Sequence, residues 1–160
     1  MQEIRRARST DISRLAEIFV FAKRVAYRAI FRDDRLWFGT LQVLPVAAGY
    51  QTDPHRLNGT WVYGETFAKG FITVEGEEIT KLFVDPFFQG EGIGERLLSF
   101  AVQEKGGKYL WALEENRAAL RFYRKHGFVP TGERKKAEDF DAYTLKLIWN
   151  AGQEESQNEL

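Results

Sequence analysis

The fold of this chain is decided by the stretch LFVDPFFQGEGIGERLL, which runs from Leu82 to Leu98. Its pattern predicts an apolar strand, a turn at Asp85-Pro86, a glycine-rich loop and a helix that begins inside the loop. Pro86 has no amide hydrogen and disfavours helical geometry at Asp85, so we expect the strand to end there. Apolar residues then recur at helical spacing and predict the buried face of the helix, at Ile93, Leu97, Leu98, Ala101 and Val102.

The three loop glycines, Gly90, Gly92 and Gly94, stand where the first turn of a helix leaves backbone amides unpaired. Because glycine has no Cβ, a phosphate can approach those amides closely, and the helix dipole favours its negative charge. The stretch therefore predicts a diphosphate-binding loop. A tight strand-to-helix turn that needs glycine for its geometry alone explains the same residues equally well, and both interpretations stay open at this point.

Two common phosphate-binding motifs do not fit the loop. A P-loop requires Gly-Lys-Ser/Thr, whereas Gly94 is followed by Glu95 and Arg96. A dinucleotide fingerprint requires a third glycine at the position of Glu95. Binding of NAD or ATP at this loop is kept as a third hypothesis, which stabilisation of the protein by those nucleotides would support.

The pattern Gln89-x-x-Gly92-x-Gly94 resembles the acetyl-CoA pyrophosphate loop of the GNAT superfamily of N-acetyltransferases. A second segment, NRAALRFYRKHGF (Asn116–Phe128), is similar to the family's N-x-x-A-x-x-F-Y-x-x-x-G-F pattern and lies at the family's usual distance downstream. With the strands beside these motifs, the resemblance covers roughly residues 60–148.

The resemblance implies three sets of contacts with acetyl-CoA. The loop is expected to hold the pyrophosphate through Gln89, Gly90, Glu91, Gly92, Ile93, Gly94 and Glu95. The backbone of Leu82, Phe83 and Val84 resembles the segment that pairs with the pantetheine arm and polarises the thioester carbonyl. Asn116 is a good helix N-cap, and the resemblance adds a contact with the same arm.

One feature of the loop departs from the family. The family often has Arg or Lys between the positions of Gln89 and Gly92, whereas Gly90-Glu91 carries no positive charge. Phosphate binding would then rest on backbone amides.

Acetyl transfer from a thioester to an amine also needs an acid that protonates the departing thiolate. The resemblance puts Tyr123 at the family's acid position and among its cofactor contacts. Without the motif, Tyr123 would be interpreted as an ordinary tyrosine of an amphipathic helix.

The amine must lose a proton, since an amine of the lysine type has a pKa of about 10.4. Glu78 is the candidate base, because some family members carry a glutamate on the strand before the loop. Strand alternation predicts that Glu78 shares a face with Thr80, Leu82 and Val84. An exposed carboxylate at a strand start is the alternative for Glu78, and Glu114 is a second candidate base.

Composition limits the other function classes. The 160 residues suit one domain with a core, and zero net charge argues against a broad surface for nucleic acid or membranes. Without cysteine the chain has no disulfide or thiolate chemistry, and with two distant histidines, His55 and His126, we predict no metal site. The start of the sequence lacks an apolar leader and no stretch is long enough to span a membrane, so a cytoplasmic protein is expected.

The periodicities predict the order β-α-α-β-β-β-α-β-α-β-β, which is also the order of the GNAT fold. We therefore expect a single α/β (α+β) domain over residues 1–149, with a mixed, mostly antiparallel sheet flanked by helices, and a disordered tail over 150–160. The expected helices are 12–29, capped by Thr10 or Asp11, then 33–41, 93–105 and 116–127. The expected strands are 3–8, 60–65, 67–75, 78–84, 108–113, 128–133 and 143–148, with residues 42–59 as loop.

Three aromatic residues of the N-terminal half, Tyr27, Phe31 and Trp37, are expected in the core. The resemblance implies a second role for this region, which helps to line the acceptor pocket in the family.

The leading hypothesis is an N-acetyltransferase that transfers an acetyl group from acetyl-CoA to a primary amine by direct attack in a ternary complex. The acceptor is a small-molecule or peptide amine, and the protein acts alone or as a homodimer. The alternative is a non-catalytic acyl-CoA sensor or interaction module on the same fold. Neither the acceptor nor the acyl chain length follows from the sequence.

Overall fold

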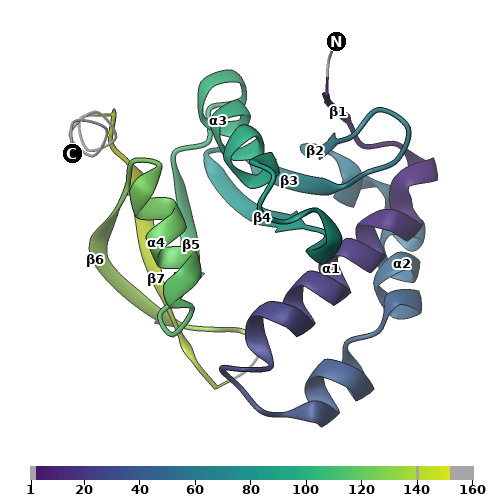
Figure 1. Ribbon diagram of the computed structural model, residues 1–160, viewed down its shortest axis with the longest axis horizontal. Helices are drawn as coiled ribbons and strands as arrows, with labels where there is room; N and C mark the ends of the chain where they lie inside the picture. Colours follow the sequence, from purple (N-terminus) through teal and green to yellow (C-terminus); the bar gives the residue numbers. More distant parts are fainter. Residues whose placement is uncertain (1–2, 140, 152–160) are drawn as a thin grey trace.

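The computed structural model describes residues 3–139 and 141–151 (Figure 1). Its helices are α1 (Ile12–Tyr27), α2 (Val43–Thr52), α3 (Ile93–Lys105) and α4 (Arg117–Lys125). Its strands are β1 (Ile4–Arg6), β2 (Thr60–Tyr63), β3 (Gly70–Glu75), β4 (Glu78–Val84), β5 (Tyr109–Leu113), β6 (Phe128–Lys136) and β7 (Tyr143–Trp149). Within the described ranges, no helix is both long and apolar enough to cross a membrane.

The strands form one seven-stranded sheet with the order β1-β2-β3-β4-β5-β7-β6. All neighbouring strands are antiparallel except β4 and β5, which are parallel. The connection between these two strands is the glycine-rich loop and α3, the stretch from which the fold was predicted. The order of strands and helices agrees with the sequence prediction, although the second helix lies at Val43–Thr52 and not at 33–41.

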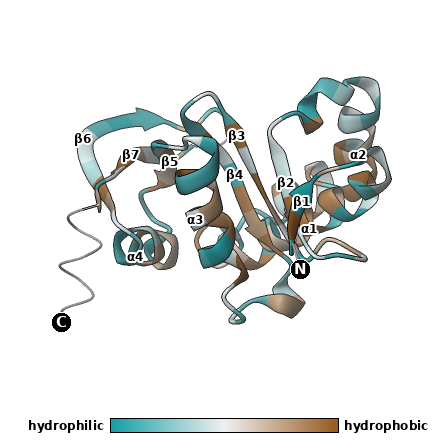
Figure 2. Ribbon diagram, turned by 90° about the horizontal axis from the view of Figure 1, so that it is seen from above, coloured by the Kyte–Doolittle hydropathy of each residue, from teal (hydrophilic) through white to brown (hydrophobic). Residues whose placement is uncertain are grey.

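Helices cover both faces of the sheet, and each face has its own core (Figure 2). On one face α1 and α2 bury a cluster that includes Leu15, Ile18 and Phe71. On the other face the apolar side of α3 packs on the sheet, with Leu97 at 0% exposure, and α4 adds partly buried aromatic residues. The helical periodicity predicted for α3 is thereby confirmed, since Ile93, Leu97, Leu98 and Ala101 are all buried.

The prediction of a loop over residues 42–59 is wrong, because α2 and a 3-10 turn, η3 (Pro54–Leu57), lie there. Pro45 is the third residue of α2, where no intrahelical hydrogen bond needs its missing amide. Gly49 lies in the interior of α2 because the Arg56 guanidinium occupies the space that a Cβ would fill. Tyr50, 2% exposed, anchors the helix in the α1 core. Tertiary packing thus stabilises a helix with weak intrinsic preference.

Other boundaries differ by a few residues. The expected helix at 33–41 is a π-helical turn, η2 (Arg35–Thr40), whose Trp37 is buried as predicted. The connection after β2 runs to Lys69 rather than Thr66, because Ala68 is fully buried against α1 and α2. β6 continues to Lys136, beyond its expected end at residue 133, past a register shift near Gly132. Residues 152–160 of the expected tail lie outside the described residues.

Asp11 is the N-cap residue of α1, one of the two predicted, but its carboxylate does not accept a hydrogen bond from the helix. It binds residues that precede it in the sequence. It accepts two hydrogen bonds from the Arg5 guanidinium, at 2.8 and 2.9 Å, and one from the Arg8 amide at 2.8 Å. Burial alone would raise the pKa of Asp11, but these bonds outweigh it and hold the pKa below its ordinary value. The ion pair ties β1 to α1.

Asp11→Asn is therefore expected to lower the free energy of unfolding at pH 7 by about 1–3 kcal/mol. Because the pKa is lowered in the folded state, the stabilisation is present above the unfolded carboxyl pKa of about 3.9 and is lost as the pH falls through the folded value. Urea unfolding of both proteins at pH 7 and at pH 3 measures this. A stability difference that stays the same at both pH values would contradict the assignment.

Candidate active site

The sheet is split between β4 and β5. The two parallel strands pair only at Glu78 and Tyr109, and they diverge beyond that point (Figure 1). On its other edge β4 stays paired with β3 as far as Val84. The backbone of Leu82–Val84 therefore has one edge without a strand partner among the described residues, and an extended chain could pair with it.

A cavity of about 700 Å³ occupies the split. Its walls come from both faces of the sheet, because α1 contributes Phe19, Lys23 and Tyr27 and α4 contributes Tyr123. Further walls come from β4, β5, the C-terminal end of β6 and the start of the β6–β7 connection, with Arg56 of η3, Gln89 and Thr144 of β7. A site of this form allows two ligands to enter from opposite faces of the sheet and to meet at its centre.

The glycine loop has the geometry predicted for a phosphate site. Gly90 and Gly92 have φ angles of 82° and 81°, which other residues adopt at a cost, and Gly92 is the N-cap of α3. A Cβ on either glycine would meet no atom within 4 Å, so the space above the loop is open. The first amides of α3 have no intrahelical acceptor and lie at the helix end where this loop joins it. The residues present therefore fit a pyrophosphate, which their backbone donors would hold.

The side chains of the loop play smaller roles. Ile93 is 3% exposed and belongs to the core, so only its backbone is offered to a ligand. Glu91 and Glu95 are exposed and form no ion pair among the described residues. Gln89 donates from Nε2 to the Val84 carbonyl oxygen at 3.1 Å, and its side chain lines the cavity. It therefore fixes the loop against the end of β4.

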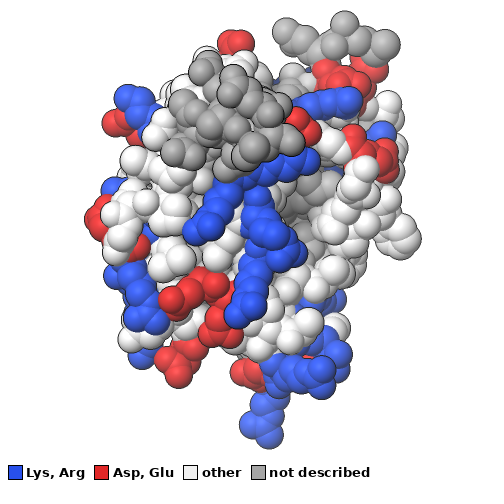
Figure 3. Space-filling view, turned by 60° about the vertical axis from the view of Figure 1, so that its left-hand side comes forward, with Lys and Arg blue, Asp and Glu red and all other residues white. Residues whose placement is uncertain are grey.

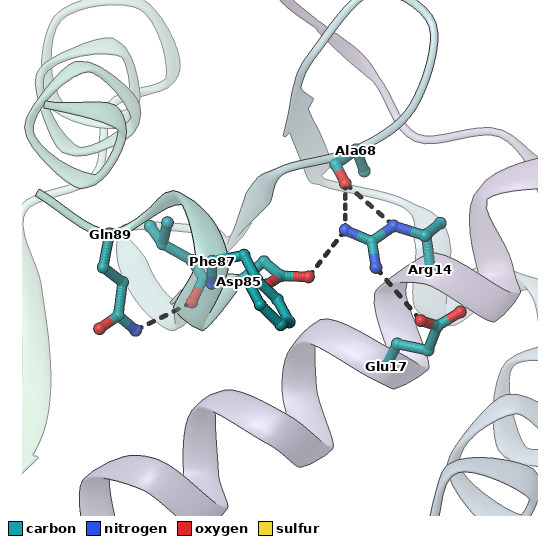
Figure 4. A network of polar contacts seen from close by, with 7 residues as sticks. Arg14, Glu17, Ala68, Asp85, Phe87 and Gln89 are labelled. Carbon is teal, nitrogen blue, oxygen red and sulfur yellow. Dashed lines mark hydrogen bonds and ion pairs between the residues drawn. The ribbon is translucent and has the colours of Figure 1, made fainter. Parts of the chain in front are cut away.

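A second network holds the exit of β4 against α1 (Figure 4). Asp85, 5% exposed, accepts hydrogen bonds from the Phe87 amide and from the Arg14 guanidinium, both at 2.9 Å. Arg14 also donates to the Ala68 carbonyl oxygen at 2.8 Å and to Glu17 at 3.2 Å. This network positions the turn that precedes the glycine loop.

Glu78 lines the cavity, but the predicted strand alternation fails around it. The register between β3 and β4 shifts, because Lys81 pairs with Thr73 while Ile79 pairs with Val74. Thr80 is thus an extra residue, a β-bulge, which reverses the alternation on its N-terminal side. The prediction that Glu78 shares a face with Leu82 is wrong for this reason.

The two faces of β4 can be assigned from the two cores. Ile79, Leu82 and Val84 pack on the α3 side. Phe83 belongs to the α1–α2 side, where its ring lies 5.1 Å from that of Phe19. Because Glu78 pairs with Glu75 one position before Ile79, its half-buried side chain lies on the α1–α2 side. A base at Glu78 would therefore serve a ligand that enters from the side of α1.

Tyr123 lies on α4 and lines the cavity opposite α1. Burial, and then the nearby Tyr27 hydroxyl, raise the pKa of Tyr123 well above the ordinary value for tyrosine. The phenol therefore stays protonated and can donate a hydrogen bond or a proton. Asn116 caps α4 as predicted, since its side-chain oxygen accepts from the Ala119 amide at 3.2 Å, and it lines the same cavity.

Other candidates lie outside the cavity lining. Glu114 is bound by Arg134, with 2.9 Å between Oε2 and the guanidinium, and does not line the cavity. Trp37 is a core residue, whereas Tyr27 lines the cavity, so only one of the two supports the expected acceptor wall.

The sequence prediction missed several cationic cavity residues: Lys23, Arg56, Lys81, Lys135 and Lys136. One signal in the sequence could have identified Lys23. It lies four residues before Tyr27 on α1, so both side chains lie on one helix face. Figure 3 shows Lys and Arg side chains gathered on the face that is turned forward there. In the sequence of β6, three cationic residues follow one another, Arg134–Lys136. Among the described residues, the cavity lining therefore carries five cationic side chains beside three carboxylates, Glu78, Glu138 and Asp139.

Comparison with known proteins supports the motif assignment. Residues 56–130 match the family described as the acetyltransferase (GNAT) domain. The peptidyl-lysine N-acetyltransferase YjaB of Salmonella typhimurium is 39% identical over 70 residues, which are 44% of this chain and 48% of YjaB. The N-alpha-acetyltransferase RimI of Mycobacterium tuberculosis is 40% identical over 74 residues, 43% of this chain and 47% of RimI. The chain spans about half the length of the curated relatives it matches.

Solved structures extend the similarity in fold to most of the chain. The solution structure of apo-form YjaB from Escherichia coli has a TM-score of 0.70 at 23% identity and covers 91% of this chain and 95% of that one. PaiA N-acetyltransferase from Thermoplasma acidophilum, solved with coenzyme A, has a TM-score of 0.64 at 18% identity and covers 93% of this chain and 100% of that one. The fold predicted from the sequence is thereby confirmed.

Proposed function

Because this chain carries a GNAT acetyltransferase domain, we propose that it transfers an acetyl group from acetyl-CoA to a primary amine. The observation that carries the proposal is the cavity in the split sheet. It brings the free edge of Leu82–Val84, the side chain of Asn116 and the Tyr123 phenol around one space, beside the open amides of the glycine loop.

Each part of the site has a role in this reaction. Acetyl-CoA, when bound, supplies a thioester whose carbonyl carbon accepts the amine. The loop amides from Gly90 to Glu95 hold the pyrophosphate, and Asn116 orients the pantetheine arm. The free edge of Leu82–Val84 pairs with that arm and directs a backbone N–H at the thioester oxygen. Tyr123 gives its proton to the departing thiolate.

Glu78 is proposed to receive the proton of the attacking amine, directly or through water. The β-bulge supports this role, because it turns the carboxylate towards the α1–α2 side while the glycine loop lies at the start of α3. Acceptor and donor would then meet from opposite faces. The names of the relatives, which refer to peptidyl lysine and to α-amines, support a primary amine on a peptide or a small molecule.

Thermal unfolding with CoA, acetyl-CoA, NAD and ATP in parallel tests the cofactor site. A ligand at about 100 times its Kd adds about 2.7 kcal/mol, which for this size raises Tm by about 5–11 °C. We expect this rise in Tm only with CoA and acetyl-CoA, and not with NAD or ATP. In a separate assay with acetyl-CoA and a panel of amines, we expect release of free CoA thiol. A rise with NAD or ATP instead, or no thiol release with any amine, would refute the proposed function.

Gly92→Ala is expected to lower CoA affinity about tenfold or more, since the added methyl group enters the space in front of the loop amides. Gly106→Ala is the matched control. Gly92 and Gly106 cap opposite ends of α3, both have left-handed φ angles, of 81° and 70°, and a Cβ on either meets no atom within 4 Å. Both variants therefore carry similar backbone strain, and calorimetry should show weaker binding only for Gly92→Ala. If both variants lost CoA affinity equally, the effect of Gly92→Ala would come from lower protein stability and not from contact between the loop and CoA.

A further inference from the structure

Three cationic side chains from distant parts of the chain converge on the α1 side of the cavity: Lys23 of α1, Arg56 of η3 and Lys81 of β4. We call them the cationic cluster. Each lies against an aromatic ring. The Lys23 ammonium is 4.4 Å from the centre of the Phe19 ring, and Arg56 and Lys81 lie 5.4 and 6.0 Å from the centre of the Tyr50 ring. The aromatic rings and the cavity wall thus hold the three charges in one region.

None of the three forms an ion pair with a carboxylate among the described residues. Acidic groups are near, since Asp139 acts on Lys23 and Glu75 acts on Lys81, but neither comes within ion-pair distance. The cluster is therefore a set of cations whose direct anionic partner is missing from the described part of the protein.

The charges also destabilise one another. Burial lowers the pKa of Lys23, and Lys81 lowers it further against the opposing pull of Asp139. Burial likewise lowers the pKa of Lys81, and Arg56 adds to this effect. Gathering partly desolvated like charges in a cavity costs stability, and such costs are typical of functional sites. A bound anion would remove both the repulsion and the desolvation penalty.

The cluster is separate from the glycine loop. Lys81 pairs across the sheet with Thr73 and faces the α1–α2 side, with Phe83, whereas the loop opens at the N-terminus of α3. Glu78, the proposed base, lies on the same face of β4 as Lys81. A ligand held by the cluster would therefore be an acceptor that presents its amine to Glu78.

We propose that the cationic cluster binds a carboxylate or phosphate group of the acceptor, so that the substrates are amines that also carry an anionic group. This inference rests on the proposed acetyltransferase function and specifies its substrate class. The cluster holds the anion while the amine reaches the centre of the split sheet.

Acceptors are compared in pairs that differ in the anionic group: L-lysine with L-lysinamide, and phosphoethanolamine with ethanolamine. At saturating acetyl-CoA, we expect kcat/KM to be about tenfold to a hundredfold higher for the anionic member of at least one pair, mostly through KM. The two pairs distinguish carboxylate from phosphate recognition. Equal or better use of both neutral members would overturn the proposal.

Variants locate the effect. Lys23→Met and Lys81→Met remove a charge but keep an unbranched side chain, and each should abolish the preference, while Lys81→Arg should retain it. Lys105→Met is the matched control, because Lys105 also lies on an aromatic ring, 4.0 Å from the Trp61 ring centre, but outside the cavity. Its variant should keep the wild-type preference. A preference that survives both charge-removing variants would refute the assignment.

A measurement without turnover separates this inference from the proposed function. Lys81→Met should have a higher Tm than the wild type in the absence of ligand, because the repulsion within the cluster is relieved. Phosphoethanolamine or L-lysine alone should raise the Tm of the wild type and not of Lys81→Met. If no amine is acetylated, a rise in Tm with either compound still supports an anion site at the cationic cluster. If neither compound raises the Tm of the wild type, the anion site is refuted.

Discussion

Replacing Tyr123 with phenylalanine is expected to lower kcat by about 10²–10⁴-fold, the usual contribution of a positioned acid. The substitution removes one hydroxyl from the cavity and leaves the ring, which packs against Phe122 and Phe128 at 5.3 and 5.9 Å between centres. Since the ring and the glycine loop stay in place, affinity for CoA should change little. Steady-state kinetics and calorimetry on the same preparations separate the two effects.

The environment of Tyr123 keeps its hydroxyl group protonated. Burial raises its pKa above the ordinary value for tyrosine, so the phenol keeps its proton at neutral pH and can donate it. For the same reason, loss of activity on the basic side below pH about 10 is not expected to come from ionisation of Tyr123.

Tyr109→Phe is the matched control for Tyr123→Phe. It removes the same hydroxyl from a residue of β5 that pairs with Glu78 but does not line the cavity. Its kcat should remain within a few-fold of the wild type. If Tyr123→Phe kept full turnover, the acid assignment would be withdrawn. If wild type and variant both bound CoA without any turnover, the non-catalytic acyl-CoA sensor would be the better description.

Asp85→Ala is expected to have the largest effect on stability, a loss of about 3 kcal/mol. The side chain is 6% exposed, and its removal leaves the half-buried Arg14 guanidinium without its closest carboxylate and the Phe87 amide without an acceptor (Figure 4). For a chain of this length the loss corresponds to a fall in Tm of about 6–12 °C. Differential scanning calorimetry measures it directly.

Asp34→Ala provides the control for Asp85→Ala. Asp34 also pairs with an arginine at 2.9 Å, but the side chains of Arg28 and Asp34 are 55% and 59% exposed. Solvent screens such a pair, so its removal should hardly change Tm. Because Asp85 also fixes the turn before Gln89, CoA affinity should fall in Asp85→Ala and not in Asp34→Ala. Similar falls in Tm for both variants would show that the Arg14–Asp85 network does not stabilise the fold as inferred.

Features that depend on a few consecutive residues could be predicted from the sequence. Pro86 ended β4, Gly90 and Gly92 adopted the left-handed conformations that a phosphate loop needs, and Asn116 capped α4. These features were predictable because backbone conformation and helix capping are set by residues within one turn of each other. The candidate role of Tyr123, by contrast, follows only from the resemblance of its segment to the family pattern.

The positions at which distant groups meet become visible only in the folded protein. The helix at Val43–Thr52 depends on burial of Tyr50, and the face on which Glu78 lies depends on a bulge at Thr80. The cationic cluster arises only when α1, η3 and β4 come together around the cavity. Strand register and the packing of helices on the sheet fix these positions through contacts between residues far apart in the chain, and no local periodicity encodes such contacts.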